Sequence, residues 1–443
     1  MTTLGSFLTP FMGSSINIAL PAIGKEFTLG AAQLGWVALS FLLAAAMFLV
    51  PFGRIADIWG KRRVFAWGIA VFTAASLLSG LSPSAPLLIA FRALQGIGSA
   101  MIFGTGVAIL TSVFPPGERG NALGINVASV YLGLSLGPFL GGLLTHYLGW
   151  RSTLLIHVPL GLLVLALCLR VPGEWAEARG ESFDWRGSLL YSLTLVAVMY
   201  GLSLLPSAWG VWLLLLGLLG ILGFLHWEVR VERPVVEVRL FRDSPVFALS
   251  NLAALINYSA TFAVGFLLSL YLQYVKGLSP QQAGLILVSQ PAMMVILSPF
   301  AGRLSDRLEP RIVASAGMVL TTAALSFFVF LQDSTTQWFI VSSLALLGMG
   351  LAFFSSPNTN AVMSSVEKRS SGVASGILGT MRLMGQMLSM GVAMFLITLH
   401  VGRDPITPGR HSLLLHGTRV SFLLFALLCG AGIFASLARG RVR

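Results

Sequence analysis

The chain has 443 residues, of which 56% are apolar and only 10% are charged, and its formal net charge is +12. A soluble globular protein carries about 25% charged residues, so this chain lacks the polar side chains of a water-facing surface, and lipid must be its main solvent. Because the basic residues are spread over short connections and form no single basic face, we expect no nucleic-acid partner.

Fourteen apolar segments are each long enough to cross a bilayer, which takes roughly 20 helical residues. The sequence therefore predicts an all-α membrane protein with 14 transmembrane helices. The first segment has no basic region before it, which predicts a span and not a cleavable signal peptide. The predicted spans are 4–24, 34–53, 64–83, 86–113, 122–146, 152–171, 187–205, 209–227, 246–274, 281–301, 312–331, 337–356, 372–400 and 419–438.

Lysine and arginine gather in every second connection. With the N-terminus inside, the inner connections and the C-terminal tail hold 20 of these 28 residues and the outer connections hold 6. Because basic residues favour the cytoplasmic side, we expect both termini in the cytoplasm and the protein in the cell membrane. The other two, Arg92 and Arg382, lie inside predicted spans.

An internal repeat relates the two ends of the chain. The sequence Gly-Arg-Ile-Ala-Asp at 53–57 returns as Gly-Arg-Leu-Ser-Asp at 302–306, and Gly-Asn-Ala-Leu-Gly at 120–124 has an echo at 372–376. The offsets of 249 and 252 residues predict two pseudo-symmetric six-helix bundles with the seventh and eighth spans inserted between them, a design common in transporters. The predicted domains are a first bundle at 1–172, linkers and an inserted two-helix hairpin at 173–243, and a second bundle at 244–443.

The segment 53–63, with Asp57 and a basic cluster at its end, resembles the signature loop of the major facilitator superfamily. A tight turn needs glycine, basic residues hold the loop at the cytoplasmic face, and an acid there is expected to be paired or to cap a helix. The resemblance implies a latch between the two halves; the alternative is a loop that only sets topology. The predicted gating set is Gly53, Asp57, Gly60, Lys61, Arg62, Arg63, Glu118, Arg119, Gly302 and Asp306.

The fifth span resembles the antiporter motif of the exporting branches of that superfamily. Small residues let helices approach closely, and a proline inside a helix bends it. The resemblance implies export, while the alternative is plain glycine packing. The motif residues are Gly124, Gly133, Gly137, Pro138, Gly141 and Gly142.

The first span resembles that of the 14-span drug:proton antiporters, in which an acid usually stands about where Met12 stands here. Cation recognition through that acid is therefore not expected. Asn17 remains a polar candidate in this span.

An arginine inside a span costs about 2.5–3.5 kcal/mol on insertion scales, so it needs a wet cavity or a partner. Arg92 and Gln95 of the fourth span resemble a motif linked to proton coupling in the superfamily; for Arg92, snorkelling to the outer interface is the alternative. Arg382 lies about ten residues, or roughly 15 Å, into its helix, with Gln386 on the same face.

Further polar side chains complete the predicted cavity and coupling set. His157 could carry a proton, but a buried histidine more often bonds to the backbone. Each of the others could equally make a packing or interhelical hydrogen bond. They are Asn257, Tyr258, Gln273 and Gln290.

These features together predict a secondary active transporter that exports lipophilic or amphipathic small molecules by alternating access, coupled to protons. Two embedded arginines without acidic partners favour an anionic or neutral substrate over a cation. The alternatives are an uncoupled or symporting carrier of organic anions or lipids and, from another class, a sensor or scaffold on a transporter fold. The expected partners are the lipid bilayer, a small-molecule substrate and protons as the coupling ion, and we expect a monomer as the working unit.

The sequence offers no sign of an enzyme. It has no nucleophile–base set, and Cys168 and Cys429 lie inside apolar segments, where they are expected to be small buried side chains. Walker-type phosphate loops are also absent. We therefore expect no cofactor and no metal.

Overall fold

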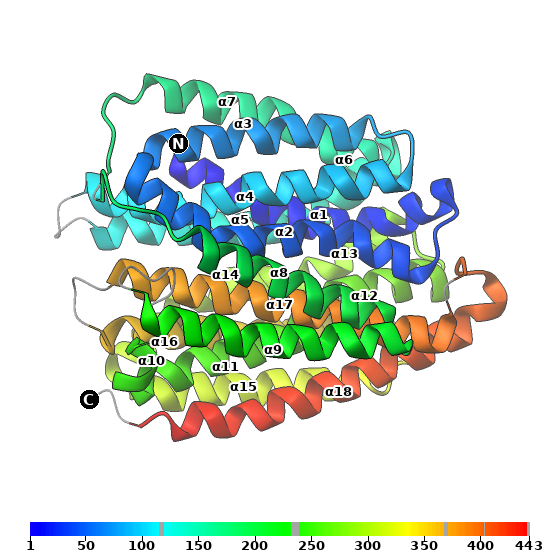
Figure 1. Cartoon of the computed structure of the whole chain (residues 1–443). Coiled ribbons are helices and arrows are strands. Elements are labelled where there is room, and N and C mark those ends of the chain that lie inside the picture. The colour runs from blue at the N-terminus through cyan, green and yellow to red at the C-terminus, as the bar shows by residue number, and fades with distance from the viewer. Residues whose placement is uncertain (115–118, 177, 232–238, 367–370, 403, 441–443) are drawn as a thin grey trace. The chain divides into compact units, whose positions relative to one another are not determined.

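The fold is seen in a computed structural model of the whole chain, in which helices dominate (Figure 1). The structure describes residues 1–114, 119–176, 178–231, 239–366, 371–402 and 404–440. Within this part the side chains of 119–121, 123, 239, 306, 371 and 372 are not described.

The chain divides into two compact units, and each is described by itself. Unit 1 holds 1–23 and 36–236, and unit 2 holds 24–35 and 237–443, so the turn between the first two spans belongs to unit 2. The helices that begin in the first half of the chain are α1 Thr2–Phe27, α2 Ala31–Trp59, α3 Lys61–Gly80, α4 Ala85–Val113, α5 Arg119–Leu148, α6 Arg151–Leu155, α7 His157–Arg170, α8 Trp185–Leu204 and α9 Ala208–Arg230. The later ones are α10 Arg239–Asp243, α11 Pro245–Thr261, α12 Val264–Leu270, η1 Tyr271–Val275, α13 Pro280–Leu287, α14 Ser289–Arg307, α15 Pro310–Phe328, α16 Gln337–Ser364, α17 Ser371–Val401, η3 Pro408–Arg410 and α18 His411–Ala438.

The predicted number of spans is confirmed, since 14 helical segments of the described chain are long and apolar enough to cross a membrane. The fold class is confirmed as well: two related six-span bundles with a two-helix insertion. In lipid every backbone N–H and C=O must be bonded within the protein, which a helix achieves by itself. This requirement explains why apolar runs of this length fold as helices.

The glycine contacts of the two bundles repeat with the sequence. In unit 1, a Cβ on Gly98 of α4 would lie 2.8 Å from the carbonyl oxygen of Gly68 on α3. In unit 2, a Cβ on Gly317 of α15 would lie 2.7 Å from the carbonyl oxygen of Gly350 on α16. Gly317 lies 249 residues after Gly68, and Gly350 lies 252 residues after Gly98. These are the offsets of the sequence repeat, so the two bundles share one close helix crossing.

The predicted loop between the second and third spans is wrong. The apolar pattern ended the second span at residue 53, but α2 continues to Trp59 and α3 starts at Lys61. Only Gly60 lies between them, with a φ of 115°, a conformation that favours glycine. Hydropathy reports where a helix leaves lipid and not where it ends, so the helical turns at 54–59, which carry the charged Arg54 and Asp57, were mistaken for a loop.

Prolines break two spans that the sequence predicts as continuous. A proline clashes with the carbonyl four residues before it and cannot donate to it. Accordingly α6 ends at Leu155, four residues before Pro159, and α13 ends at Leu287, four residues before Pro291. Each break leaves a short helix that meets the next one after a single residue.

The predicted span 246–274 is also divided, without a proline. Phe262 and Ala263 separate α11 from α12, and the amide of Ala263 donates to the Ser389 hydroxyl on α17 at 3.0 Å. The span ends in the π-helical turn η1. Burial within unit 2 permits such irregular backbone, because a side chain replaces the lost helical bond.

The inserted hairpin of α8 and α9 packs on α2 within unit 1. The Tyr191 hydroxyl of α8 donates to the carbonyl of Ala46 at 3.0 Å, and the Trp36 indole donates to the Ser203 hydroxyl at 2.8 Å. α8 and α9 lie side by side, in close contact (Figure 1). The outer face of α9 exposes leucines and Trp212, as expected for a helix that faces lipid.

Three glycines of the antiporter motif form a stripe against α1. A Cβ on Gly133 would lie 2.6 Å from the carbonyl oxygen of Phe7, and one on Gly141 would lie 2.8 Å from Cα of Ser15. Gly137 lies between them and faces Ser14. By contrast, a Cβ on Gly124 would meet nothing within 4 Å. The motif therefore joins α5 to α1 through its middle part, around Pro138.

We predict that Gly133→Ala lowers the melting temperature by several degrees, whereas Gly124→Ala, on the same helix, leaves it unchanged or slightly raised. Both changes gain up to about 1 kcal/mol of helix propensity, but only the first forces a methyl group onto a carbonyl, at a cost of about 1–3 kcal/mol. Labelling of the buried Cys168 and Cys429 thiols by a fluorogenic maleimide during heating measures unfolding. Equal melting temperatures would show that α1 and α5 do not approach as closely as described.

Candidate functional site

Arg92 of α4 is completely buried and is surrounded by neutral groups. Its Nε donates to the carbonyl of Val37 at 3.1 Å, its Nη1 donates to Oε1 of Gln95, and its guanidinium carbon lies 4.6 Å from the centre of the Phe41 ring. No carboxylate in the described chain forms an ion pair with it. The side chain therefore has partners inside the bundle and does not snorkel to the interface.

Gln95 extends this network to α3. Its Nε2 donates to the Ser76 hydroxyl at 2.7 Å, and that hydroxyl donates to the carbonyl of Phe72 at 2.7 Å. Gln95 and Ser76 each accept one hydrogen bond and donate another in this network. The amide of Gln95 is therefore fixed with its oxygen toward Arg92. We call Arg92, Gln95 and Ser76 the first arginine cluster.

His157, the first residue of α7, contacts the aromatic rings beside this cluster. Its ring centroid lies 4.9 Å from that of Phe11 and 6.0 Å from that of Phe72, and its Nδ1 lies 2.9 Å from the carbonyl oxygen of Thr153. A carbonyl can only accept, so Nδ1 carries a proton. This is the backbone-bonded arrangement that the sequence analysis set against proton carriage.

Arg382 of α17 is the centre of a comparable cluster in unit 2. Its Nη2 donates to the Thr359 hydroxyl at 2.6 Å, and its guanidinium carbon lies 5.8 Å from the centre of the Tyr258 ring. The Tyr258 hydroxyl lies 3.3 Å from Oγ of Ser355 on α16. Nε of Arg382 is buried without a partner in the described chain. We call Arg382, Tyr258, Thr359 and Ser355 the second arginine cluster.

The other predicted cavity residues lie apart from these clusters. Asn257 is fully buried, and its Nδ2 lies 4.0 Å from Sγ of Cys429 on α18, so it contacts a neighbouring helix. Asn17 is buried in α1. Gln290 and Gln386 are half-buried, and their side chains make no hydrogen bond to the described part of the chain.

The segment after α7 caps the N-terminus of α3. Gly60 has no side chain to accept from the first amides of that helix. Instead Glu174 accepts from the amide of Arg62 at 2.8 Å, and the carbonyl of Trp175 accepts from the amide of Lys61 at 2.8 Å. A carboxylate at this position also interacts favourably with the helix dipole.

The same segment covers the end of α2. Glu181 pairs with Arg54 at 2.6 Å, and the amide of Ala178 donates to the carbonyl of Asp57 at 2.9 Å. Phe183 packs against a buried apolar cluster shared by α2 and α3. We call residues 171–184 the strap; of these the structure describes all but 177. From its sequence alone this stretch is expected to be only a linker.

Asp57 is ion-paired. One of its carboxylate oxygens lies 3.6 Å from Nζ of Lys61, whose side chain is only 4% exposed and also donates to the Ser112 hydroxyl of α4 at 3.3 Å. Nε of Arg63 lies 3.6 Å from Glu174. The basic cluster of the signature segment is thus already in contact with acids of unit 1.

The remaining residues of the predicted gating set lie in or near α2, α5 and α14. Glu118 lies outside the described residues, and the side chains of Arg119 and Asp306 are not described. Gly302 lies in α14, where a Cβ would approach the Ser356 hydroxyl to 3.2 Å, and Gly53 lies in α2 with open space beside it.

A buried arginine, counted from the sequence only as a topology signal, organises the end of unit 2 at which α18 finishes. Arg439 is 1% exposed and donates to Oδ1 of Asn358 at 2.7 Å, to the Ser250 hydroxyl at 3.2 Å and to the carbonyl of Pro310 at 3.0 Å. Burial lowers the pKa of Arg439 to about 10, while Glu309 opposes the shift. The group therefore stays charged at neutral pH and joins α18 to α11, α15 and α16.

The described residues contain no group of three or more His, Cys, Asp or Glu side chains that could hold a metal ion. The chemistry available at the two arginine clusters is therefore electrostatic: a fixed positive charge, hydroxyl and amide groups, and aromatic faces.

The family model of the Major Facilitator Superfamily matches residues 2–234 and 251–442. The chain belongs to this superfamily. A riboflavin transporter, RibZ of Clostridioides difficile strain 630, is 30% identical over 396 residues, which cover 88% of this chain and 85% of that protein. The cephamycin export protein CmcT of Amycolatopsis lactamdurans is 35% identical over 402 residues, 87% of this chain and 82% of that protein.

Among solved structures, a bacterial homologue of the human lysosomal transporter Spinster, inward-facing and unoccupied, has the same fold. It aligns with a TM-score of 0.67 at 20% identity, over 99% of this chain and 95% of that one. These relatives are transporters, so this chain is a multi-pass transporter of the superfamily, with export proteins among its homologues.

We predict that Glu174→Ala speeds hydrogen exchange of the first-turn amides of α3 by about five- to tenfold. Loss of a helix cap costs about 1 kcal/mol, and amide exchange reports such local opening. The matched control is Glu181→Ala, which removes a half-exposed ion pair worth at most about 1 kcal/mol and leaves those amides bonded. Exchange measured by mass spectrometry on peptides covering 60–66 separates the two; equal effects of both variants would refute capping by Glu174.

Proposed function

We propose that this transporter exports lipophilic organic anions, and neutral compounds of similar shape, from the cytoplasm in exchange for protons. Both termini would be cytoplasmic, as the distribution of basic residues favours. Its mechanism would be alternating access by the two bundles, the design to which duplicated halves belong. Export is supported by the antiporter motif and by homology to an export protein.

The observation that carries the proposal is the pair of guanidinium groups inside predicted spans, fully buried at Arg92 and half-buried at Arg382, that bond only to neutral oxygens. Burying a charge without a counter-charge costs several kcal/mol, so Arg92 and Arg382 are poor choices if stability alone matters. An ionisable group inside a membrane protein is a functional residue by default. An anion entering beside either arginine would supply the missing negative charge, whereas a cation would be repelled.

The flat faces near these arginines favour a substrate with an aromatic or otherwise apolar body. The rings of Phe41 and Tyr258 stand beside the two guanidiniums. Hydroxyl groups of Thr359 and Ser355 can bond to oxygen atoms of a ligand. A carboxylate on a ring system fits both kinds of contact.

Coupling to protons would use groups near the cytoplasmic face or the substrate itself. No acid lies deep in a span of the sequence, and His157 is engaged with backbone and aromatic rings. The remaining carriers are Asp57 and Glu118 near the cytoplasmic face, or the charge of the substrate itself.

This favours one second candidate, an uncoupled carrier of organic anions. A membrane potential of 100 mV is worth about 2.3 kcal/mol per charge, and 1.4 kcal/mol is a factor of ten in concentration. An inside-negative potential could therefore expel a monovalent anion against a gradient of about fiftyfold without protons.

The test compares three naphthalene compounds of one size in proteoliposomes: 1-naphthoate, neutral 1-naphthalenemethanol and cationic 1-naphthylmethylammonium. We expect flux of the anion and the neutral compound, with proton movement seen by an internal pH dye. Arg92→Met and Arg382→Met should each reduce naphthoate flux at least tenfold, because the attracting charge is gone, while Lys at either position keeps part of it.

Arg419→Met is the matched control, since Arg419 also lies on a membrane helix but donates to the carbonyl of Val329 outside both clusters. Melting curves confirm that each variant is folded. Flux without proton movement would promote the uncoupled candidate. Flux of the cation alone would overturn the proposed substrate class.

A further inference from the structure

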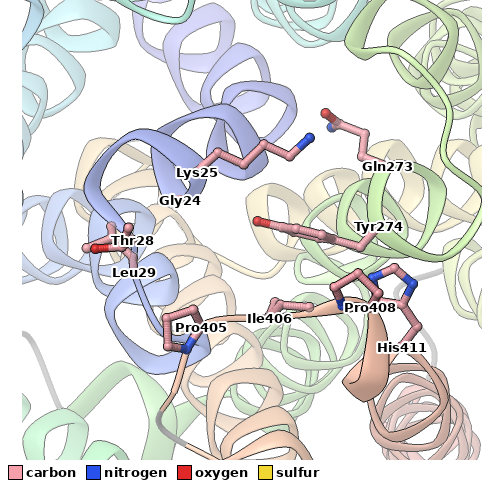
Figure 2. Close-up of a pocket in the computed structure, with 10 residues that line it drawn as sticks. All are labelled: Gly24, Lys25, Thr28, Leu29, Gln273, Tyr274, Pro405, Ile406, Pro408 and His411. Carbon is pink, nitrogen blue, oxygen red and sulfur yellow. The ribbon is translucent and has the colours of Figure 1, made fainter.

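The described part of unit 2 has an open cavity of about 350 Å³, and Gln273 alone among the predicted polar candidates lines it. Its walls come from the end of α1 and the turn after it, from η1, and from the segment that leads into α18 (Figure 2). All lining residues fall within unit 2. The topology proposed above places this cavity at the outer face of the membrane. A volume of this size suits a small organic ligand.

The walls of the cavity are fixed in place by local contacts. Gly30 and Pro405 form an isolated antiparallel bridge, which joins the α1–α2 turn to the segment before α18. Arg410 pairs with Asp404 at 2.7 Å and donates to the carbonyl of Val401 at 2.8 Å, which closes that segment on itself. Thr28 has a φ of 52°, a strained conformation for a β-branched residue. Such strain often marks functional sites.

The π-helical turn presents two neighbouring side chains to the same cavity. In η1 the amide of Lys276 bonds to the carbonyl of Tyr271, five residues back, at 3.0 Å. Turns of this kind occur frequently at functional sites. Both Gln273 and Tyr274 line the cavity, and Gly24 leaves room for the tyrosine: a Cβ there would lie 3.1 Å from its hydroxyl.

The polar groups of the cavity suit an anion. Lys25, His411, Gln273 and Tyr274 can all donate hydrogen bonds, and no carboxylate is among the lining residues. Lys25 makes no ion pair with any described residue. Figure 2 shows its side chain extended across the cavity toward the Gln273 amide, above the Tyr274 ring. A cation here would find no counter-charge, whereas a carboxylate would find several donors.

The remaining lining is apolar and flat. Ile406 and Pro408 lie on the side of the Tyr274 ring away from Lys25 in Figure 2, and the ring of Tyr274 lies 6.4 Å from that of His411. Such walls accommodate the planar apolar part of a ligand whose charged end is directed to Lys25.

We propose that this cavity is a second binding site, specific for small aromatic carboxylates, and that Lys25 binds their carboxylate group. Its position at the outer face rests on the proposed orientation of the transporter; binding itself depends neither on that orientation nor on transport. The site is independent of both arginine clusters, none of whose residues line it.

The probe is 6-fluoro-2-naphthoate, whose fluorine resonance broadens on binding to the full-length protein in lipid nanodiscs. We expect saturable broadening that Lys25→Gln weakens at least tenfold and Lys25→Arg largely preserves. Ile406→Trp should abolish it by filling the cavity. Lys276→Gln is the matched control, because that lysine donates to the carbonyl of Asp333 and does not line the cavity, so it should bind like wild type.

The measurement is repeated in the Arg92→Met, Arg382→Met double variant, which separates this inference from the proposed function. Binding that persists there and vanishes in Ile406→Trp supports the second site even if naphthoate is never transported. Binding that is lost in the double variant but unchanged in Lys25→Gln and Ile406→Trp overturns it. Equal binding of neutral 6-fluoro-2-naphthalenemethanol would overturn the assignment to carboxylates.

Discussion

Lipid offers no hydrogen bonds, so every polar group within the hydrocarbon layer must find its partner inside the protein. This constraint shapes the molecule at every level. It makes the apolar runs helical, and it allows the backbone to break only where another group of the protein replaces the lost bond, as the Ser389 hydroxyl does for the amide of Ala263. It also dictates that Arg92 collects a carbonyl, an amide oxygen and an aromatic face from two helices. These neutral partners hold the guanidinium in place but do not neutralise its positive charge. That charge remains available to bind a substrate.

The same constraint explains the glycine stripe of α5 and the crossings of α3 with α4 and of α15 with α16. Helices in lipid gain little from hiding apolar side chains, because lipid is as apolar as they are, and they associate through close packing instead. Gly133 and Gly141 bring α5 onto α1, and the pair of Gly68 and Gly98 occupies the same place in unit 1 as the pair of Gly317 and Gly350 in unit 2. The antiporter motif of this chain therefore serves first to pack α5 closely against α1, and any role in export depends on that packing.

Much of this could be predicted from the sequence, because the span count, the repeat and the fold class all depend on hydropathy and local similarity. Helix ends could not, since the helical residues 54–59 include the charged Arg54 and Asp57, and neither could the breaks before Pro159 and Pro291, which need knowledge of which helices cover them. The strap was missed because Glu174 and Glu181 act on residues more than a hundred positions away. Arg439 was missed because charge counting cannot distinguish a buried arginine from one that lies at the membrane surface. For Asn257 the sequence left a cavity role and an interhelical contact equally open, and the structure places its side chain beside Cys429 of α18.

The strap also changes how the signature segment is understood. Its basic residues already contact Glu174 and Glu181 inside unit 1, so any other acid that binds them has to compete with these two.

The most direct test of the central claim, that the transported species carries negative charge, is the dependence of naphthoate efflux from proteoliposomes on membrane potential at fixed pH gradient. Our account predicts that an inside-negative potential drives efflux, with the slope of one charge for an uncoupled carrier or two for exchange against one proton. A flux that ignores the potential, or that an inside-negative potential opposes, would contradict it.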